Sequence, residues 1–220
     1  MVITRGSCVA LRFTGKSEGK VFDTNVPEEL MKLKPGASAE EALVIVGEHM
    51  LVPGLDNALI GKEIGTLYTL TLAPSEAFGM RQPTLVKMVP LKLFTAKQLI
   101  PRAGMTLALD DTLVRVVSVS GGRVTVDFNN PLAGKEVSYT YTITRLVTDQ
   151  KERARVALQA VFKFVPEHTV DAGGVTVLLP ATLEPYITRI APTFSKVMGL
   201  PLLFKEKLPA SPLPATQTAQ

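Results

Sequence analysis

The residue types that most often carry covalent or metal chemistry are scarce in this chain. It has one cysteine, Cys8, and two histidines, His49 and His168, among 220 residues. A cysteine nucleophile needs a histidine base in a recognisable arrangement, and neither histidine lies in a matching motif. We therefore interpret Cys8 as a free buried thiol, and we find no acid–base pair or triad. The segment after Lys207 contains no His, Cys, Asp or Glu, so we predict no metal site there and no cofactor.

Composition and charge exclude several classes of protein. Apolar residues make up 46% of the chain and charged residues 20%, which is enough to bury a core. A single cysteine cannot form an internal disulfide, which fits a reducing compartment. Arg5, Arg12 and Lys16 interrupt the apolar run that a signal peptide would need at the N-terminus. No apolar run of about 18 residues, the length that a membrane span needs, occurs either. We expect a cytoplasmic protein that does not cross a membrane.

The net charge of +4 is concentrated in one segment. Residues 84–125 contain six Lys or Arg against two Asp, which is 6 − 2 = +4, so the remaining residues balance. Nucleic-acid or ribosome contact through this segment is an alternative with less support, because no arginine cluster is interleaved with aromatic residues.

Hydrophobic patterning predicts a mainly β N-terminal half. Apolar residues alternate in 8–14, 66–72 and 137–143, which indicates half-buried strands. Residues 43–46 are a buried strand, and 25–41 are predicted to be an irregular surface loop. A helix of about two turns is predicted after Pro53, with Gly61 past its end.

Two further segments differ in character. Residues 84–125 are rich in Leu, Val and Met, carry a hairpin turn at Gly121-Gly122, and read as an insertion. After Asp149 the pattern becomes helical, with strands at 175–180 and 202–208 and a second helix at 183–198. The first of these helices has an apolar stripe formed by Ala154, Ala157, Leu158, Val161 and Val165. Residues 209–220 are rich in Pro and polar residues, which predicts disorder.

Three ordered motifs carry a family resemblance. GKVFDT at 19–24, VGEHMLVPGLDNALIGKEIG at 46–65 and LAPSEAFG at 72–79 resemble the FKBP-type peptidyl-prolyl cis/trans isomerases. LVKMVPLKLF at 85–94, AGMTL at 103–107 and VDFNNPLAGKEVSYTYTI at 126–143 are similar to the SlyD-like branch. Members of that branch carry a chaperone domain inserted in the flap over the active site.

The resemblance implies an α+β fold, in which an FKBP-like antiparallel sheet wraps on a short helix. It implies a discontinuous isomerase domain at 1–83 and 126–147, with a mainly β insert-in-flap domain at 84–125. Residues 149–208 are similar to the C-terminal α/β extension of the long archaeal members, which implies a homodimer through this region. Residues 209–220 form the predicted disordered tail.

The family's pocket maps onto eight positions. The resemblance assigns a catalytic role to Phe22, Asp23, Phe78 and Tyr139, and substrate binding to Phe13, Leu51, Val52 and Leu55. Phe13 and Phe78 stand where the family often has Tyr, and Leu55 stands where single-domain members have Trp. Taken without the motifs, Phe13, Phe22 and Phe78 would read as ordinary core residues and Asp23 as a turn cap.

The predicted partners are unfolded or nascent polypeptides. Inside a flap insertion, apolar side chains are expected to form an exposed binding surface, and the residues assigned to it are Val86, Val89, Leu91, Leu93, Phe94, Leu99 and Met105. The expected function is isomerisation of X–Pro bonds combined with folding assistance. The alternative is a non-catalytic holdase or adaptor on a decayed isomerase scaffold.

Overall fold

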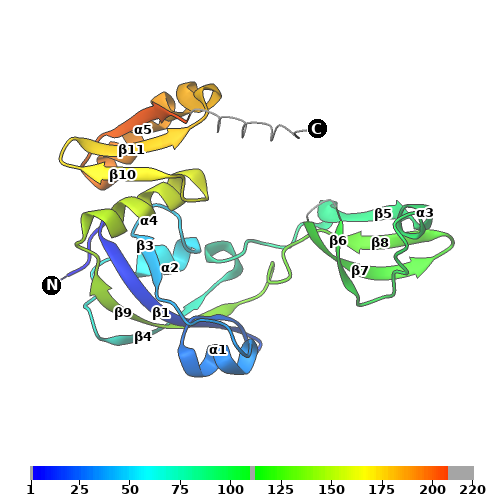
Figure 1. The fold of residues 1–220 in the computed structure, drawn as a ribbon. Coiled ribbons are helices and arrows are strands. Elements are labelled where there is room, and N and C mark those ends of the chain that lie inside the picture. The colour runs from blue at the N-terminus through cyan, green and yellow to red at the C-terminus, as the bar shows by residue number, and fades with distance from the viewer. Residues whose placement is uncertain (1, 110–111, 208–220) are drawn as a thin grey trace, which may run out of the picture.

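The first sheet forms the base of the molecule. The computed structural model describes residues 2–109 and 112–207. Five antiparallel strands form this sheet: β1 (Cys8–Ser17), β2 (Lys20–Thr24), β3 (Ala42–Ile45), β4 (Leu67–Leu72) and β9 (Val137–Leu146). The order is β2-β1-β9-β4, and β3 pairs with the part of β1 that does not pair with β2. Strand β9 lies far along the chain from β4, so the sheet is complete only when the chain comes back from the segment between β4 and β9 (Figure 1).

Strand β1 is buried on both faces along its first half, although its alternation predicted a half-buried strand. Val9, Leu11 and Phe13 face one apolar core, which they share with the helix α2 (Pro53–Ala58). Cys8 and Ala10 face a second core, on the other side of the sheet. The prediction of half-burial failed because Cys8 and Ala10 are small. Residues of this size also pack against a second layer of structure, but the alternation of the large apolar residues Val9, Leu11 and Phe13 does not show this.

Helix α1 (Pro27–Leu33) corrects a second expectation, because residues 25–41 were predicted to be irregular. Pro27 occupies the first turn, Glu28 and Glu29 follow it, and Lys32 lies in the last turn. Proline at the first position and charges that complement the helix dipole favour a helix here. The predicted helix after Pro53 is present as α2, and the strands predicted around residues 43–46 and 66–72 are β3 and β4.

The segment between β4 and β9 forms a second antiparallel sheet of its own. The 3-10 turns η1 (Pro74–Glu76) and η2 (Pro83–Leu85) lead to β5 (Val86–Pro90) and helix α3 (Leu91–Thr95). Strands β6 (Thr106–Leu109), β7 (Thr112–Ser120) and β8 (Arg123–Asp127) complete the sheet in the order β5-β8-β7-β6. In Figure 1 this sheet stands away from the first one and is joined to it by two chain segments.

This insert sheet has a separate small core. Phe94, on α3, is fully buried against Val114, Val116, Val124 and Val126. Phe94 was predicted to belong to an exposed binding surface, and this prediction is wrong. Its side chain fills the space between α3 and the insert sheet. Val126 belongs to this core as well, so the last strand of the insert ends at Asp127 and not at residue 125.

The C-terminal region packs on the back of the first sheet. It contains α4 (Gln150–Phe162), the hairpin of β10 (His168–Asp171) and β11 (Gly174–Leu179), the turn η3 (Ala181–Leu183), α5 (Glu184–Met198) and β12 (Leu202–Glu206). Strand β10 and its hairpin were not predicted. Asp149 caps α4 by accepting the Glu152 N–H at 2.8 Å, and β12 runs parallel to β11.

Helix α4 lies between the first sheet and the C-terminal strands (Figure 1). Its residues Ala154, Ala157 and Leu158 share one core with Cys8 and Ile45 of the first sheet. The apolar stripe of α4 is thus covered within this chain. Outside it, Arg145 at the end of β9 contacts Glu152 of α4 at 2.7 Å and Glu41 at 3.1 Å.

No helix in residues 2–109 and 112–207 is long and apolar enough to cross a membrane. The tail predicted to be disordered, 209–220, lies outside the described residues.

Candidate functional site

A cavity of about 420 Å³ opens between α2 and the concave side of the first sheet. Strands β1, β2 and β9, the loop before α2 and the segment after η1 all contribute to its walls. The lining residues are Phe13, Asp23, Met50, Leu51, Val52, Pro53, Leu55, Ala77, Phe78 and Tyr139. Eight of these ten side chains are apolar, and Asp23 is the charged one.

Aromatic rings form one wall of the cavity. The rings of Phe13 and Tyr139 lie 6.1 Å apart with their planes tilted by 60°. Phe22 contacts Phe78 edge-on at 5.6 Å and Tyr139 edge-on at 5.8 Å. Such edge-to-face contacts hold rings in fixed orientations. Phe22 is not among the lining residues, so it supports the two rings that face the cavity.

Gly15 makes this ring packing possible. It lies opposite Tyr139 across β9 and opposite Asp23 across β2, where β1 also carries a register shift. A Cβ atom at residue 15 would come within 2.7 Å of the Phe22 Cζ atom and 2.9 Å of the Tyr139 Cε1 atom. Only a residue without a side chain lets both rings lie against the strand.

The Tyr139 hydroxyl is held in its neutral form. Burial, together with the nearby negative charge of Asp23, raises the pKa of Tyr139 to about 12. Within the described residues the Asp23 carboxylate accepts no hydrogen bond from a side chain, because Phe13 offers no hydroxyl. The cavity therefore combines apolar, aromatic walls with the exposed carboxylate of Asp23.

Asp56 fixes the loop that brings Leu51 and Val52 to the cavity. Its side chain is only 2% exposed. Oδ1 accepts the Gly47 N–H at 2.9 Å and Oδ2 accepts the His49 N–H at 3.2 Å. His49 has a left-handed backbone with φ of 54°, and the two hydrogen bonds hold the turn in which it lies. We had not predicted this role from the sequence, because an aspartate in the first turn of a helix is ordinary.

Helix α2 is seated closely on the sheet beside this loop. Leu55, 1% exposed, points into the apolar core and also lines the cavity. Gly54 lies against Leu72 and Glu76, and a Cβ atom there would collide with the Leu72 side chain. The Val52 N–H, at the start of α2, is paired with no backbone acceptor in the part of the chain that the structure describes.

Comparison with known families gives two matches. The family model for FKBP-type peptidyl-prolyl cis-trans isomerases matches residues 2–92. A model described as FKBP26, IF domain, matches residues 87–132, which fits the second sheet and the turn that follows it.

Curated relatives decide the family. A short-type peptidyl-prolyl cis-trans isomerase of Methanocaldococcus jannaschii is 31% identical over 145 residues, covering 64% of this chain and 92% of the relative. The chain belongs to the FKBP-type peptidyl-prolyl cis-trans isomerases. This isomerase is also 32% identical over 140 residues to the FKBP-type isomerase SlyD of Aeromonas hydrophila, covering 62% of this chain and 61% of that protein. It is 30% identical over 127 residues to the FKBP-type 16 kDa isomerase of Escherichia coli, covering 53% of this chain and 85% of the relative.

The structure brings together most of the positions that the family resemblance indicated. Seven of the eight line the cavity of this FKBP-type isomerase, and Phe22 lies behind them. Three further lining residues, Met50, Pro53 and Ala77, were not predicted. Each lies inside one of the quoted motifs and directly next to a predicted residue, and that position is the signal that could have found it.

The residues assigned to the insert's apolar surface are only partly exposed. Leu93 and Met105 are exposed, at 58% and 41%. Val89, Leu91 and Leu99 are half-buried against the small core, and Val86 is also half-buried. The prediction missed other exposed apolar residues of the insert, which are Met88, Ile100, Leu113, Val117 and Val119.

Proposed function

We propose that the cavity beside α2 is the isomerase site and that it works by excluding water from a twisted amide. Rotation about an X–Pro bond meets a barrier of about 18–20 kcal/mol because amide resonance holds the bond planar. The twisted amide is less polar than the planar one, so an apolar site stabilises it relative to the ground state. The apolar lining of the cavity is the observation that carries this proposal.

The roles of individual residues follow from their positions. Tyr139 and Phe78 pack against the substrate proline ring, and Leu55 forms the floor beneath it. The free Val52 N–H donates a hydrogen bond to a substrate carbonyl, which fixes the peptide while the bond rotates. Asp23 places its carboxylate beside the amide. No proton transfer is needed, which agrees with a lining that pairs no acid with a base.

We propose that the insert sheet is the part that holds unfolded clients. Its exposed apolar residues include Met88, 67% exposed, and Met105. Methionine side chains adapt to many apolar partners, and exposed apolar patches on a folded unit are typical of binding surfaces. The insert is attached between Phe78 and Tyr139, so a client held on it is kept close to the isomerase cavity.

Replacing the insert tests this division of work. Asn129 joins the two connecting segments through Gln82, with hydrogen bonds of 2.8 Å and 3.0 Å. A short turn in place of residues 83–128 keeps this pairing, so the first sheet should fold. We expect activity on a short X–Pro peptide to stay within about threefold, whereas catalysis of proline-limited protein refolding should fall by about 10²-fold.

One control variant makes the result decisive. Phe78→Ala in the full chain should lower both activities together, because it changes the cavity and leaves the insert in place. If the variant with the short turn refolds a protein client as fast as the full chain does, the insert is not the client-binding unit.

We expect the protein to act in the cytoplasm, where its single cysteine would stay reduced.

A further inference from the structure

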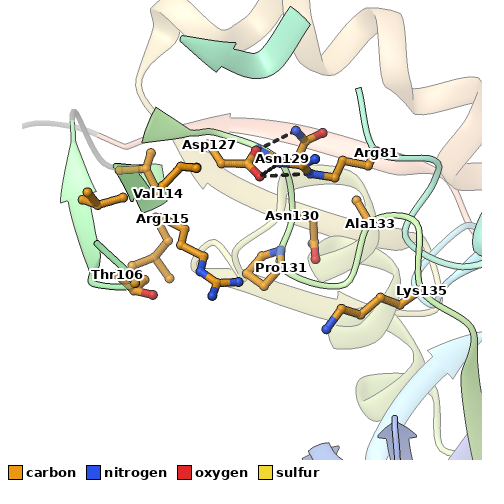
Figure 2. Close-up of a pocket in the computed structure, with 14 residues that line it drawn as sticks. Arg81, Thr106, Val114, Arg115, Asp127, Asn129, Asn130, Pro131, Ala133 and Lys135 are labelled. Atoms are coloured by element: carbon orange, nitrogen blue, oxygen red, sulfur yellow. Dashed lines mark hydrogen bonds and ion pairs between the residues drawn. The ribbon is translucent and has the colours of Figure 1, made fainter. Parts of the chain in front are cut away.

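A second and larger cavity lies where the insert joins the rest of the molecule. It has a volume of about 620 Å³. We call it the neck cleft, and its lining residues are Arg81, Gly104, Thr106, Leu113, Val114, Arg115, Val116, Val117, Asp127, Asn129, Asn130, Pro131, Ala133 and Lys135. One wall is the face of β6 and β7 that the small core does not cover. The other wall is the chain returning from β8 to β9 (Figure 2).

The neck cleft combines apolar walls with cations. Leu113 and Val117 are 65% and 46% exposed, although the core-facing residues between them are buried. Among the described residues, three basic ones, Arg81, Arg115 and Lys135, line the same space, against the single acidic residue Asp127. Figure 2 shows the side chains of Arg115 and Lys135 extending into the space beside Pro131 from opposite walls.

The Asp127 carboxylate, which lines the neck cleft, is already satisfied. Asp127 lies opposite Arg115 in the strand register, yet its Oδ2 accepts hydrogen bonds from Arg81 at 2.6 Å and 3.1 Å. Its Oδ1 accepts from the Asn129 backbone and side chain. Burial opposes ionisation of Asp127, but the hydrogen bonds from Arg81 and Asn129 outweigh it and lower its pKa.

Arg115 is consequently left without an anion. Within residues 2–109 and 112–207 its side chain makes no ion pair or hydrogen bond. Among the described residues the Lys135 ammonium pairs only with Glu18, at 3.0 Å, and both side chains are well exposed. An exposed pair of this kind contributes little to stability, so another carboxylate can replace Glu18. A guanidinium presents a planar fork of donors that fits a carboxylate.

The neck cleft is within a short peptide's reach of the isomerase cavity. Phe78 lines the isomerase cavity and Arg81 lines the neck cleft, and three residues of chain span at most about 11 Å. The bond from the Gly134 N–H to the Gly79 carbonyl, 2.8 Å long, ties the two connecting segments together between the cavities. One extended client segment can therefore occupy both.

We propose that the neck cleft is a specificity subsite that binds an acidic side chain of the client, about three to six residues from the X–Pro bond being isomerised. Arg115 and Lys135 bind the carboxylate, and Leu113 and Val117 contact apolar neighbours of that residue. The client is an extended, acidic segment of an unfolded polypeptide. This inference rests on the proposed function, because it requires that clients contact the insert while the cavity acts on them.

The test compares two matched peptides on the full chain. Both are about 15 residues long with one central X–Pro bond, and they carry either Glu or Gln about five residues to each side of it. NMR exchange measurements give KM and kcat for each peptide. We expect the Glu peptide to have a KM about fivefold lower than the Gln peptide, with kcat unchanged, because a partly exposed ion pair strengthens binding by this order. High salt should abolish the difference.

Variants then locate the effect. Arg115→Gln and Lys135→Gln should each remove most of the Glu preference and leave KM for the Gln peptide unchanged. Arg123→Gln removes the same charge from the insert at an exposed position that does not line the neck cleft, so it should keep the preference. Equal KM values for the two peptides on the unaltered chain would overturn the inference. An equal loss in Arg123→Gln would overturn it as well, because the charge of the whole insert would then be the cause.

The variant with the short turn separates this inference from the function beneath it. If that variant shows a higher KM for both peptides by the same factor, the insert binds clients without reading their charge, and only the subsite is wrong. If it leaves both KM values unchanged, the insert does not bind clients, and both proposals fail. A loss confined to the Glu peptide supports the subsite.

Discussion

The ring of Phe22 meets the ring of Tyr139 edge-on, with centroids 5.8 Å apart and planes at 87°. Phe22 comes from β2 and Tyr139 from β9, on the two sides of β1. The contact crosses over Gly15, which has no side chain to block it. The wall of the isomerase cavity therefore depends on a residue that never faces the cavity.

Substitution of Gly15 tests this dependence. In Gly15→Ala the added methyl group would displace Phe22 or Tyr139, since both lie closer than real Cβ contacts allow. We expect kcat/KM on a short X–Pro peptide to fall about tenfold, while overpacking costs about 1–3 kcal/mol of stability. Lys16→Ala, at the next and exposed position of β1, is the control and should change neither quantity. An unchanged kcat/KM in Gly15→Ala would show that the ring orientation does not matter.

Ionisation of Tyr139 should appear in the pH dependence of stability. Its pKa is raised to about 12 in the folded chain by burial and by Asp23, against about 10 when unfolded. As the pH rises through about 10, the unfolded chain loses this proton first, so the free energy of unfolding decreases. Tyr139→Phe removes this contribution, and its stability should decline less steeply above about pH 10. Parallel declines in denaturant titrations of the two proteins would contradict the assignment.

Asp56 should control the loop that carries Leu51 and Val52. Asp56→Ala leaves the Gly47 and His49 N–H groups without their acceptor, which costs about 1–3 kcal/mol when such groups are buried. We expect a lower free energy of unfolding and a KM for X–Pro peptides raised several-fold, because the loop is no longer held. Asn57→Ala, at the adjacent exposed position of α2, provides the comparison. Equal effects in the two variants would mean that the helix, and not the Asp56 hydrogen bonds, sets the loop.

Local patterns were sufficient to predict the strands and helices that carry the site. The alternation in β1 and β9 and the Pro53 start of α2 each depend on neighbouring residues, so the sequence predicted them. The motif at 46–65 likewise predicted Leu51, Val52 and Leu55 in one cavity. Roles that depend on contacts distant in sequence were missed, as with Gly15 beneath two rings and Asp56 beneath its loop.

Burial on the insert was harder to predict for the same reason. Phe94 and Leu93 are adjacent and equally apolar, yet one is fully buried and the other is 58% exposed. Helix α3 has only five residues, and so short a helix shows no clear periodicity. The sequence therefore does not indicate which side of α3 faces the sheet. The second layer on β1 was missed because it is supplied by α4, about 140 residues later in the chain.

A homodimer through the C-terminal region remains our prediction, now placed on a different surface. The stripe on α4 is covered within the chain, but α5 and the edge strand β12 form an apolar groove of about 470 Å³ that includes Leu203, 43% exposed. Leu203→Glu should convert a dimer into a monomer in sedimentation experiments, whereas Thr169→Glu on β10 should not. A full-length monomer at micromolar concentration would count against the dimer.

We propose that an apolar cavity whose lining pairs no acid with a base isomerises the X–Pro bond. The most direct test is kcat/KM on a short X–Pro peptide for Phe78→Ala, compared with Phe164→Ala. Phe164 is 51% exposed, in the C-terminal region, and does not line the cavity. We expect Phe78→Ala to lower kcat/KM by at least about tenfold, equivalent to about 1.4 kcal/mol of transition-state stabilisation, with the fold retained, and we expect Phe164→Ala to leave kcat/KM unchanged. A folded Phe78→Ala variant with full activity on the short peptide would contradict it.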